Sequence, residues 1–411
     1  MSSSLNSCLL LLLLSPFVGA TGVFKVRHKF QRRRAASIAD LRTHDDLRHS
    51  RMLAVADLPL GGVGAPTESG LYYSEIGIGT PRRNFYVQVD TGSDHLWVNC
   101  FPCATSCPKK NYIGLNMTVY DPNKSSSRRL ISCQDSFCLS VNGEVPYCLE
   151  KMPCDYSVRY GDGSSSAGFY VEDVVQYNRV SRDHRTKLVS ANVTFGCGAE
   201  NSGDLGSHKA LDGLIGFGKS NISMISQLAA SGKVSSRSFS HCLDSTDGGG
   251  IFVLGQVVEP KMNVTPFIPN RPHYAIEMKG IEVGGSSLEL PAYLFSTGYK
   301  QGAIIDSGTT LAYLPELAYM SIRQAIFSNY PNMSFHTTQG FDCFKFYTSV
   351  DDGFPEVVFH FEKLLMLNVY PHDYFFQIGH KFDHICDSSL TLRPRKNKRR
   401  YVHIYRVNGP S

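Results

Sequence analysis

Two aspartates, Asp90 and Asp306, have nearly the same sequence around them although they lie far apart in the chain. Each follows a short apolar run, stands first in an Asp-Thr/Ser-Gly-Ser/Thr turn, and is followed by a second apolar run. One such turn says little, because Asp, Thr and Gly are favoured in any turn between strands. Two copies in the same apolar setting predict a duplicated β unit that brings the two carboxyl groups together.

Two carboxyl groups about 3 Å apart cannot both ionise, so they share one proton and their pKa values separate. The ionised group can act as general base on water while the protonated group polarises a carbonyl, and the titration belongs to the pair. The turn glycines allow a sharp bend, and the neighbouring hydroxyls can donate hydrogen bonds that fix the adjoining loop. The residues expected to support the two carboxyl groups are Thr91, Gly92, Ser93, Ser307, Gly308 and Thr309.

These two turns resemble the active-site loops of pepsin-like aspartic proteases. The resemblance covers roughly residues 22–386 and implies an all-β, bilobal pepsin-like acid protease fold, with Asp90 and Asp306 as the catalytic pair. It implies hydrolysis of peptide bonds by an activated water, with no metal, cofactor or covalent intermediate. Because the pair must hold one proton, it also implies an acidic pH optimum.

The segment 160–168 is rich in Gly and Ser and lies between two apolar-polar runs, which predicts the mobile tip of a β-hairpin. Such a tip can be an ordinary exposed hairpin. By the resemblance it is the flap that closes over a bound peptide, with Tyr160 and Gly161 at the substrate. Trp97, the only tryptophan, follows Asp90 by seven residues. It is either a core aromatic or, as the resemblance implies, a brace for the flap.

Seven of the 12 cysteines lie between Cys100 and Cys154. A Cys-x-x-Cys pair with further cysteines could bind zinc, but irregular spacing and the signs of secretion below favour disulfides. The Cys-rich insert is similar to that of nepenthesin-like plant aspartic proteases, and most similar to an aspartic proteinase-like group with glycosylphosphatidylinositol-anchored members. That resemblance implies five disulfides and an unpaired Cys242. The implied pairs are Cys100–Cys103, Cys107–Cys197, Cys133–Cys154, Cys138–Cys148 and Cys343–Cys386.

Residues 1–20 contain an uninterrupted leucine run and end in a small-x-small site, which predicts a cleaved signal peptide rather than a membrane span. Six Asn-x-Ser/Thr sequons agree with a glycosylated protein of the secretory pathway, so we expect secretion to the extracellular space, the cell wall or the vacuole. The sequons are at Asn116, Asn123, Asn192, Asn221, Asn263 and Asn332.

Residues 24–51 are strongly basic, with nine Lys and Arg against three Asp. As the resemblance implies, we interpret residues 21–65 as a basic propeptide that covers the acidic cleft of a zymogen, with the glycine-rich stretch 60–66 as a flexible site of processing. The last 25 residues are also basic, so the net charge of +5 leaves −7 for the body of the chain. In a secreted protein, two basic ends on an acidic body fit a zymogen better than a nucleic-acid-binding protein.

We expect an N-terminal catalytic lobe at residues 66–250 and a C-terminal catalytic lobe at residues 251–386. After Cys386 the sequence does not continue with the apolar-apolar-Gly-Asp segment of a complete second lobe. Residues 387–411 are basic and lack strand alternation, so we interpret them as the product of an altered splice or reading frame. We therefore expect the support behind the Asp306 loop to be incomplete and a lipid anchor to be absent.

The sequence predicts a monomeric aspartic endopeptidase that acts on peptides and proteins and uses no metal, nucleic acid or cofactor. The alternative is a non-catalytic protein on the same scaffold, either a binding or inhibitor module or an inactive isoform. The intact Asp-Thr-Gly and Asp-Ser-Gly turns favour the enzyme, whereas the altered C-terminal sequence favours the inactive form.

Overall fold

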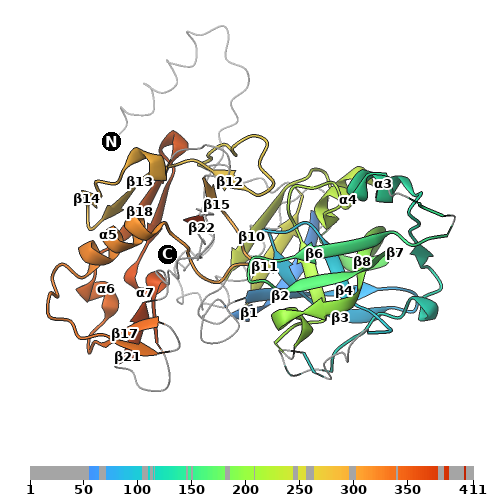
Figure 1. Ribbon diagram of the computed structural model, residues 1–411, viewed down its shortest axis with the longest axis horizontal. Coiled ribbons are helices and arrows are strands. Elements are labelled where there is room, and N and C mark those ends of the chain that lie inside the picture. The colour runs from blue at the N-terminus through green and yellow to red at the C-terminus, as the bar shows by residue number, and fades with distance from the viewer. Residues whose placement is uncertain are drawn as a thin grey trace, which may run out of the picture. The chain divides into compact units, whose positions relative to one another are not determined.

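The computed structural model, drawn in Figure 1, consists mainly of strands with a few short helices. It describes residues 55–63, 71–103, 110–111, 114, 116–144, 147–149, 151–180, 186–207, 209–243, 249–255, 263–295, 302–338, 341–377, 384–387 and 402–403. The predicted signal peptide, most of the predicted propeptide, Cys107 and most of the predicted basic tail lie outside the described residues. Within these ranges, every helix is too short or too polar to cross a membrane.

One 11-stranded sheet contains the first Asp motif. Its main path runs β10-β11-β1-β2-β3-β9-β4-β8-β7-β5, and β6 pairs with β7. The strands are β1 (Val55–Val63), β2 (Leu71–Ile78), β3 (Arg83–Asp90), β4 (Leu96–Asn99), β5 (Arg129–Leu130), β6 (Asp155–Arg159), β7 (Ser165–Val180), β8 (Thr186–Ser202), β9 (Gly213–Gly216), β10 (Phe239–Leu243) and β11 (Gly250–Leu254).

The core of this part follows from alternating polarity along its strands. Alternate residues of β2 and β3 point to one face, where Ile76, Phe85 and Val87 are fully buried together with the polar Ser74. Helix α4 adds Met224 and Leu228 to the same core. The short helices here are η1 (Pro122–Lys124), α3 (Ser136–Asn142), η2 (Gly203–Gly206) and α4 (Met224–Ala230).

The second Asp motif lies among three small sheets, ordered β12-β15-β22, β14-β13-β18-β19 and β16-β17-β21-β20. The strands are β12 (Ala275–Ile276), β13 (Met278–Val283), β14 (Ser286–Ser287), β15 (Ala303–Ile304), β16 (His336–Thr338), β17 (Phe341–Lys345), β18 (Val357–Phe361), β19 (Met366–Val369), β20 (Phe375–Gln377), β21 (His384–Asp387) and β22 (Val402–His403). The helices are η3 (Ala292–Leu294), α5 (Glu316–Ile326), α6 (Val350–Gly353), η4 (Glu362–Leu364) and α7 (Pro371–Tyr374). A second core, rich in phenylalanine, joins α5 to these sheets.

Strand β22 comes from the basic tail, for which the sequence predicts no strand. It pairs in parallel with β15, so that Ala303 faces Val402 and Ile304 faces His403. Strand β9 likewise pairs in parallel with β3, the strand that ends at Asp90, and the last residue pair between them is Asp90 and Gly216. The prediction that the tail lacks strands is therefore wrong for these two residues, because the free edge of β15 accepts a strand from it.

Strand β1 lies within the residues that we assign to the propeptide. It pairs with β2, β7 and β11, and it places Ala56, Leu58 and Leu60 in the core. Residues 60–63, expected to be flexible, are part of this strand. The domain boundaries themselves remain predictions.

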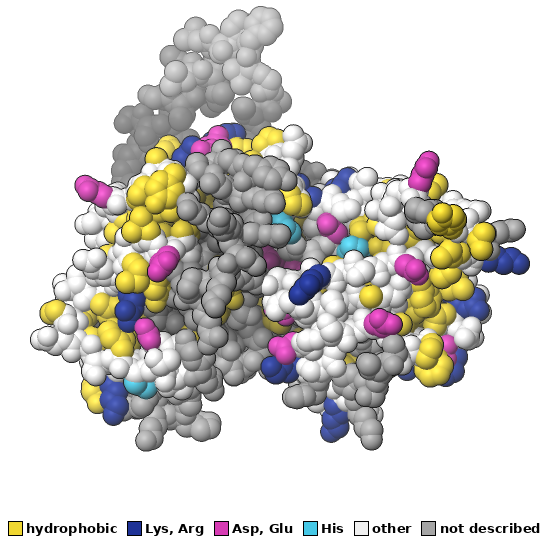
Figure 2. Space-filling model, in the orientation of Figure 1, with side chains coloured by type: hydrophobic (Ala, Val, Ile, Leu, Met, Phe, Trp, Pro, Cys, Tyr) yellow, Lys and Arg dark blue, Asp and Glu magenta, His cyan; other side chains and the backbone are white. Residues whose placement is uncertain are grey.

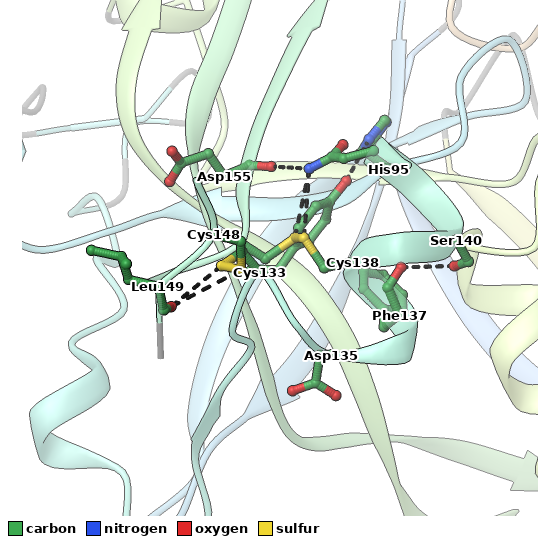
Figure 3. The surroundings of a disulfide bond; sticks show 12 residues. His95, Cys133, Asp135, Phe137, Cys138, Ser140, Cys148, Leu149 and Asp155 are labelled. Atoms are coloured by element: carbon green, nitrogen blue, oxygen red, sulfur yellow. Dashed lines mark hydrogen bonds between the residues drawn. A yellow bond between two sulfur atoms is a disulfide. The ribbon is translucent and has the colours of Figure 1, made fainter. Parts of the chain in front are cut away.

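The disulfides of the Cys-rich insert differ from the predicted pairing. Figure 3 shows the cysteines around helix α3. Cys138 on α3 faces Cys154 just before β6, which leaves Cys133 to pair with Cys148. Cys100 directly follows β4, which runs parallel to the part of β8 that contains Cys197. Cys100 and Cys197 therefore bond each other, whereas the prediction paired Cys100 with Cys103 and Cys197 with Cys107. Cys103 is disulfide-bonded as well. The structure contains the pairs Cys100–Cys197, Cys133–Cys148, Cys138–Cys154 and Cys343–Cys386.

The predicted pairs Cys100–Cys103, Cys107–Cys197, Cys133–Cys154 and Cys138–Cys148 are therefore wrong. The pair Cys343–Cys386 is confirmed, and it joins the neighbouring strands β17 and β21. Cys242 is confirmed as a free, exposed cysteine.

Candidate active site

The two aspartate turns lie against each other. A β-carbon added to Gly92 would collide with the carboxyl group of Asp306, and one added to Gly308 would collide with that of Asp90. Both side chains are buried, with exposed fractions of 5% for Asp90 and 8% for Asp306. The structure thus brings the predicted pair together, and only glycine fits at the two closest points.

Each carboxyl group accepts the same two kinds of hydrogen bond. One comes from the backbone amide two residues further on, and the other from the hydroxyl three residues further on. The bonds are Gly92 N to Asp90 Oδ1 at 2.8 Å, Ser93 Oγ to Asp90 Oδ2 at 2.5 Å, Gly308 N to Asp306 Oδ1 at 2.8 Å and Thr309 Oγ1 to Asp306 Oδ2 at 2.7 Å. The two turns are therefore chemical copies of each other, as their sequences predict.

Thr91 and Ser307 connect one turn to the other. The Ser307 amide donates to Thr91 Oγ1 at 2.8 Å, and the Thr91 amide donates to Ser307 Oγ at 3.3 Å. Ser307 Oγ also donates to the carbonyl oxygen of Val89 at 3.3 Å. Because Thr91 is buried, these bonds are shielded from water, and they hold the carboxyl groups at a fixed separation.

Burial raises the pKa of Asp90 well above its ordinary value, and the nearby charge of Asp306 raises it further. The hydrogen bonds from Ser93 and Gly92 act in the opposite direction, but they are weaker than these two effects. Asp90 therefore keeps a proton at a pH at which an exposed aspartate has lost it. A pair of this kind can supply a general acid and a general base from the same residue type.

Strand β9 and the residues after it support the Asp90 turn from behind. The Phe217 amide donates to the Asp90 carbonyl at 2.8 Å, and the Gly218 amide donates to the Ser93 carbonyl at 2.8 Å. A β-carbon on Gly216 or Gly218 would collide with the backbone of this turn. The turn is thus held at its base as well as at its carboxyl group.

Two further residues hold this support, and the sequence alone does not reveal them. Asp94 Oδ1 accepts from the Ser220 amide at 2.8 Å. Tyr274, from the second half of the chain, donates to the Phe217 carbonyl at 2.7 Å. Asp94 directly follows the first Asp motif, so the sequence predicts that it lies near the site. The sequence does not predict that it accepts a hydrogen bond from Ser220. Nothing in the sequence around Tyr274 indicates its role.

The predicted flap is a hairpin made by β6 and β7. Its tip is closed by the Tyr160 amide, which donates to the Ser164 carbonyl at 2.9 Å, and Gly161 lies in the turn. Trp97 is fully buried and its Nε1 donates to Tyr160 Oη at 2.7 Å. Burial raises the pKa of Tyr160, and the bond from Trp97 opposes this rise. Trp97 is therefore a core aromatic and also a contact of the hairpin tip.

No group of three or more His, Cys, Asp or Glu side chains in the described part of the chain could hold a metal ion. On the face drawn in Figure 2, the described Lys and Arg side chains are interspersed with Asp and Glu.

Comparison with known proteins agrees with this geometry. Two sequence profiles, described as Xylanase inhibitor N-terminal and Xylanase inhibitor C-terminal, match residues 72–256 and 273–391. Aspartic proteinase 36 of Arabidopsis thaliana is 45% identical over 362 residues, which are 88% of this chain and 74% of that protein. The chain belongs to the plant family of atypical, pepsin-like aspartic proteases.

The chain is also similar to a second plant aspartic proteinase at lower identity and, in fold alone, to a solved plant structure. Aspartic proteinase nepenthesin-2 of Nepenthes gracilis is 32% identical over 279 residues, which are 64% of this chain and 57% of that protein. The crystal structure of Basic 7S globulin from soybean superposes with a TM-score of 0.62 at 18% identity, over 85% of this chain and 89% of that chain. This similarity in structure shows that the fold is bilobal and pepsin-like.

Proposed function

We propose that the chain is an aspartic endopeptidase with an acidic pH optimum and that Asp90 and Asp306 are its catalytic residues. One carboxylate takes a proton from a water molecule, which attacks the carbonyl carbon of the scissile peptide bond. The protonated partner donates a hydrogen bond to the carbonyl oxygen, on which negative charge develops. The C–N bond then breaks, and the nitrogen leaves as an amine after it receives a proton from the pair. Because the nucleophile is water, the protein forms no covalent intermediate.

The observation that carries this proposal is the close, buried contact of the two aspartate turns. Burial and the nearby Asp306 raise the pKa of Asp90, which supports a pair that holds one proton between its two carboxyl groups. Thr91, Ser307 and the two glycines fix the pair in place, so little rearrangement is needed during the reaction.

The flap roles of Tyr160, Gly161 and Trp97 are part of the same proposal. A hairpin tip with a mobile Gly/Ser-rich turn can open to admit a peptide and close over it. The Trp97–Tyr160 hydrogen bond supports this role because it ties the tip to the strand that follows Asp90. Peptides and proteins are the proposed substrates, and nucleic acid is not.

We also propose that the protein is glycosylated in the secretory pathway and is made as a zymogen. All six sequon asparagines are described and exposed, as an oligosaccharide requires. The packing of β1 supports cleavage of the basic segment before Val55, earlier than the junction that the sequence suggests.

A second candidate function is binding or inhibition without catalysis. It is favoured by the matching profiles, whose descriptions name a xylanase inhibitor. Both aspartates and all six supporting residues are present in this chain, which favours the enzyme.

A cleavage assay separates the two candidates. The full-length protein, activated in acid, is incubated with a quenched peptide library between about pH 3 and 6, with and without pepstatin. The enzyme is supported by pepstatin-sensitive turnover that falls by about 100-fold or more in Asp90→Ala and in Asp306→Ala. Soluble wild-type protein that cleaves no peptide would support the non-catalytic candidate.

A further inference from the structure

His95 connects the predicted flap to the Asp90 turn. Its backbone carbonyl accepts from the Gly216 amide at 2.9 Å, so its position is fixed by strand β9 behind the turn. Its side chain points the other way, where Nε2 is hydrogen-bonded to Tyr170 Oη at 2.9 Å. Tyr170 belongs to β7, the second strand of the flap hairpin, and only 2% of it is exposed.

The His95 ring also packs against both strands of the hairpin. It stacks on Tyr156 of β6 with ring centroids 6.1 Å apart and on Tyr170 with centroids 6.2 Å apart. Tyr156 is buried, and its hydroxyl is hydrogen-bonded to Ser166 Oγ at 2.8 Å across the hairpin. His95 therefore contacts the stem of the hairpin, whereas Trp97, two residues on, contacts its tip.

The Cys-rich insert holds the far side of this contact. Phe137 of α3 packs edge-on against Tyr170, with centroids 5.1 Å apart. The Cys138–Cys154 disulfide ties α3 to the start of β6. Figure 3 draws His95 and Phe137 together in the surroundings of these disulfides. Tyr170 in the stem therefore contacts both Phe137 of α3 and His95, which lies close to the catalytic turn.

We propose that His95 is a positioning residue that holds the flap hairpin on the Asp90 turn and releases it when the imidazole gains a proton, which sets the acid limit of activity. This inference rests on the proposed function for its link to activity, although the packing itself does not.

Burial supports the direction of this switch. It lowers the pKa of His95, and the nearby charge of Asp94 opposes this effect more weakly. The titratable groups beside the ring are Asp94 on its own segment, Tyr156 on β6 and Tyr170 on β7, and burial raises the pKa of both tyrosines. The packed state therefore binds the proton less well than an exposed histidine does. Its stability is fully present above about pH 6.5 and is lost as the pH falls through the lowered pKa.

The test uses the single tryptophan as a reporter. Trp97 bonds the flap tip, so its fluorescence follows the position of the hairpin and needs no turnover. Fluorescence and kcat/KM are measured between about pH 3 and 7 for the full-length wild type and for His95→Gln, which keeps a polar group but cannot titrate. His336→Gln is the matched control, because His336 is exposed on β16, which belongs to a different sheet from β4 and the flap hairpin.

We expect one fluorescence transition below about pH 6.5 in the wild type and in His336→Gln, and none in His95→Gln. The acid limb of kcat/KM should move to lower pH in His95→Gln, while its alkaline limb stays in place. Identical fluorescence curves for the wild type and His95→Gln would overturn the inference. If no form cleaves a peptide but the transition is present only with His95, the proposed function fails and the contact of His95 with the flap is supported.

Discussion

At the scale of single residues, the site depends on close approach. Gly92 and Gly308 lie where any side chain would collide with a carboxyl group of the pair, and Thr91 and Ser307 link the two turns. The duplicated sequence motif predicts the meeting of the two carboxyl groups, because the same turn occurs twice in the same apolar setting. The partners of His95 and Tyr274 cannot be predicted in this way, since they depend on how distant strands fold over the turn.

Gly308→Ala should lower kcat/KM by about 100-fold, because its β-carbon would push the Asp90 carboxyl group out of place. Gly280→Ala on β13 is the matched control, since its β-carbon would have no neighbour within 4 Å. Peptide cleavage by the two purified variants checks this. Equal activity would mean that the turns are not held as closely as described.

Tyr160→Phe should lower the stability of the folded protein by about 1–3 kcal/mol, because the buried Trp97 N–H loses its acceptor. In a protein that already carries Trp97→Phe, the change Tyr160→Phe should leave the stability almost unchanged, because the N–H donor of this bond is then absent as well. Thermal unfolding of the two single variants and the double variant measures the coupling. Additive effects would show that the two side chains do not share this bond.

At the scale of elements, strands from both ends of the chain complete the sheets around the site. The sequence predicts the flap hairpin and the apolar strands before each Asp, because alternation and turn residues mark them. The sequence does not predict that β1 joins the 11-stranded sheet or that β22 pairs with β15. Such pairing depends on which strand edges remain free after the other strands have paired. The disulfide pairing could not be predicted either, because it depends on how α3 is oriented against the strands, and the sequence does not show this orientation.

A form that starts at residue 66 should be much less stable than one that starts at Val55. It lacks β1, and each buried leucine of that strand, Leu58 and Leu60, contributes about 1.5–3 kcal/mol. Thermal unfolding of both forms, with N-terminal sequencing of the acid-activated protein, checks this. A stable form starting at residue 66, together with a natural N-terminus near that position, would contradict cleavage before Val55.

Replacing Cys138 and Cys154 together by serine should lower stability by about 3 kcal/mol, as expected for a disulfide that closes a loop of this length. Cys242→Ser is the control, because Cys242 is free and exposed. Chemical unfolding measures the loss, and peptide mapping identifies the pairs. Recovery of a Cys138–Cys148 peptide from the wild type would contradict the pairing.

At the scale of the whole molecule, buried acidic groups should make the folded protein more stable in acid. Burial raises the pKa of Asp90 and raises the pKa of Asp57 on β1 to about 6. A group whose pKa is higher in the folded state contributes stability below its unfolded pKa, and this contribution is lost as the pH rises through the folded pKa. This stability profile agrees with the acidic pH optimum that the proposed function requires.

Asp90→Asn should therefore be more stable than the wild type at neutral pH, by at least about 1 kcal/mol, and equally stable at about pH 3.5. The amide cannot ionise, so the unfolded variant, unlike the unfolded wild type, is not stabilised at neutral pH by the loss of a proton at this position. Unfolding curves at the two pH values check this. If Asp90→Asn were less stable than the wild type at both pH values, the raised pKa of Asp90 would be contradicted.

The most direct test of a shared-proton aspartate pair is calorimetric titration of the full-length, acid-activated protein with pepstatin at about pH 4. Pepstatin places a hydroxyl group where the attacking water is expected between the carboxyl groups. We predict one pepstatin bound per chain, with binding lost in Asp90→Ala and in Asp306→Ala. Folded wild-type protein that does not bind pepstatin would contradict the account, because Asp90 and Asp306 would then not form a working pair.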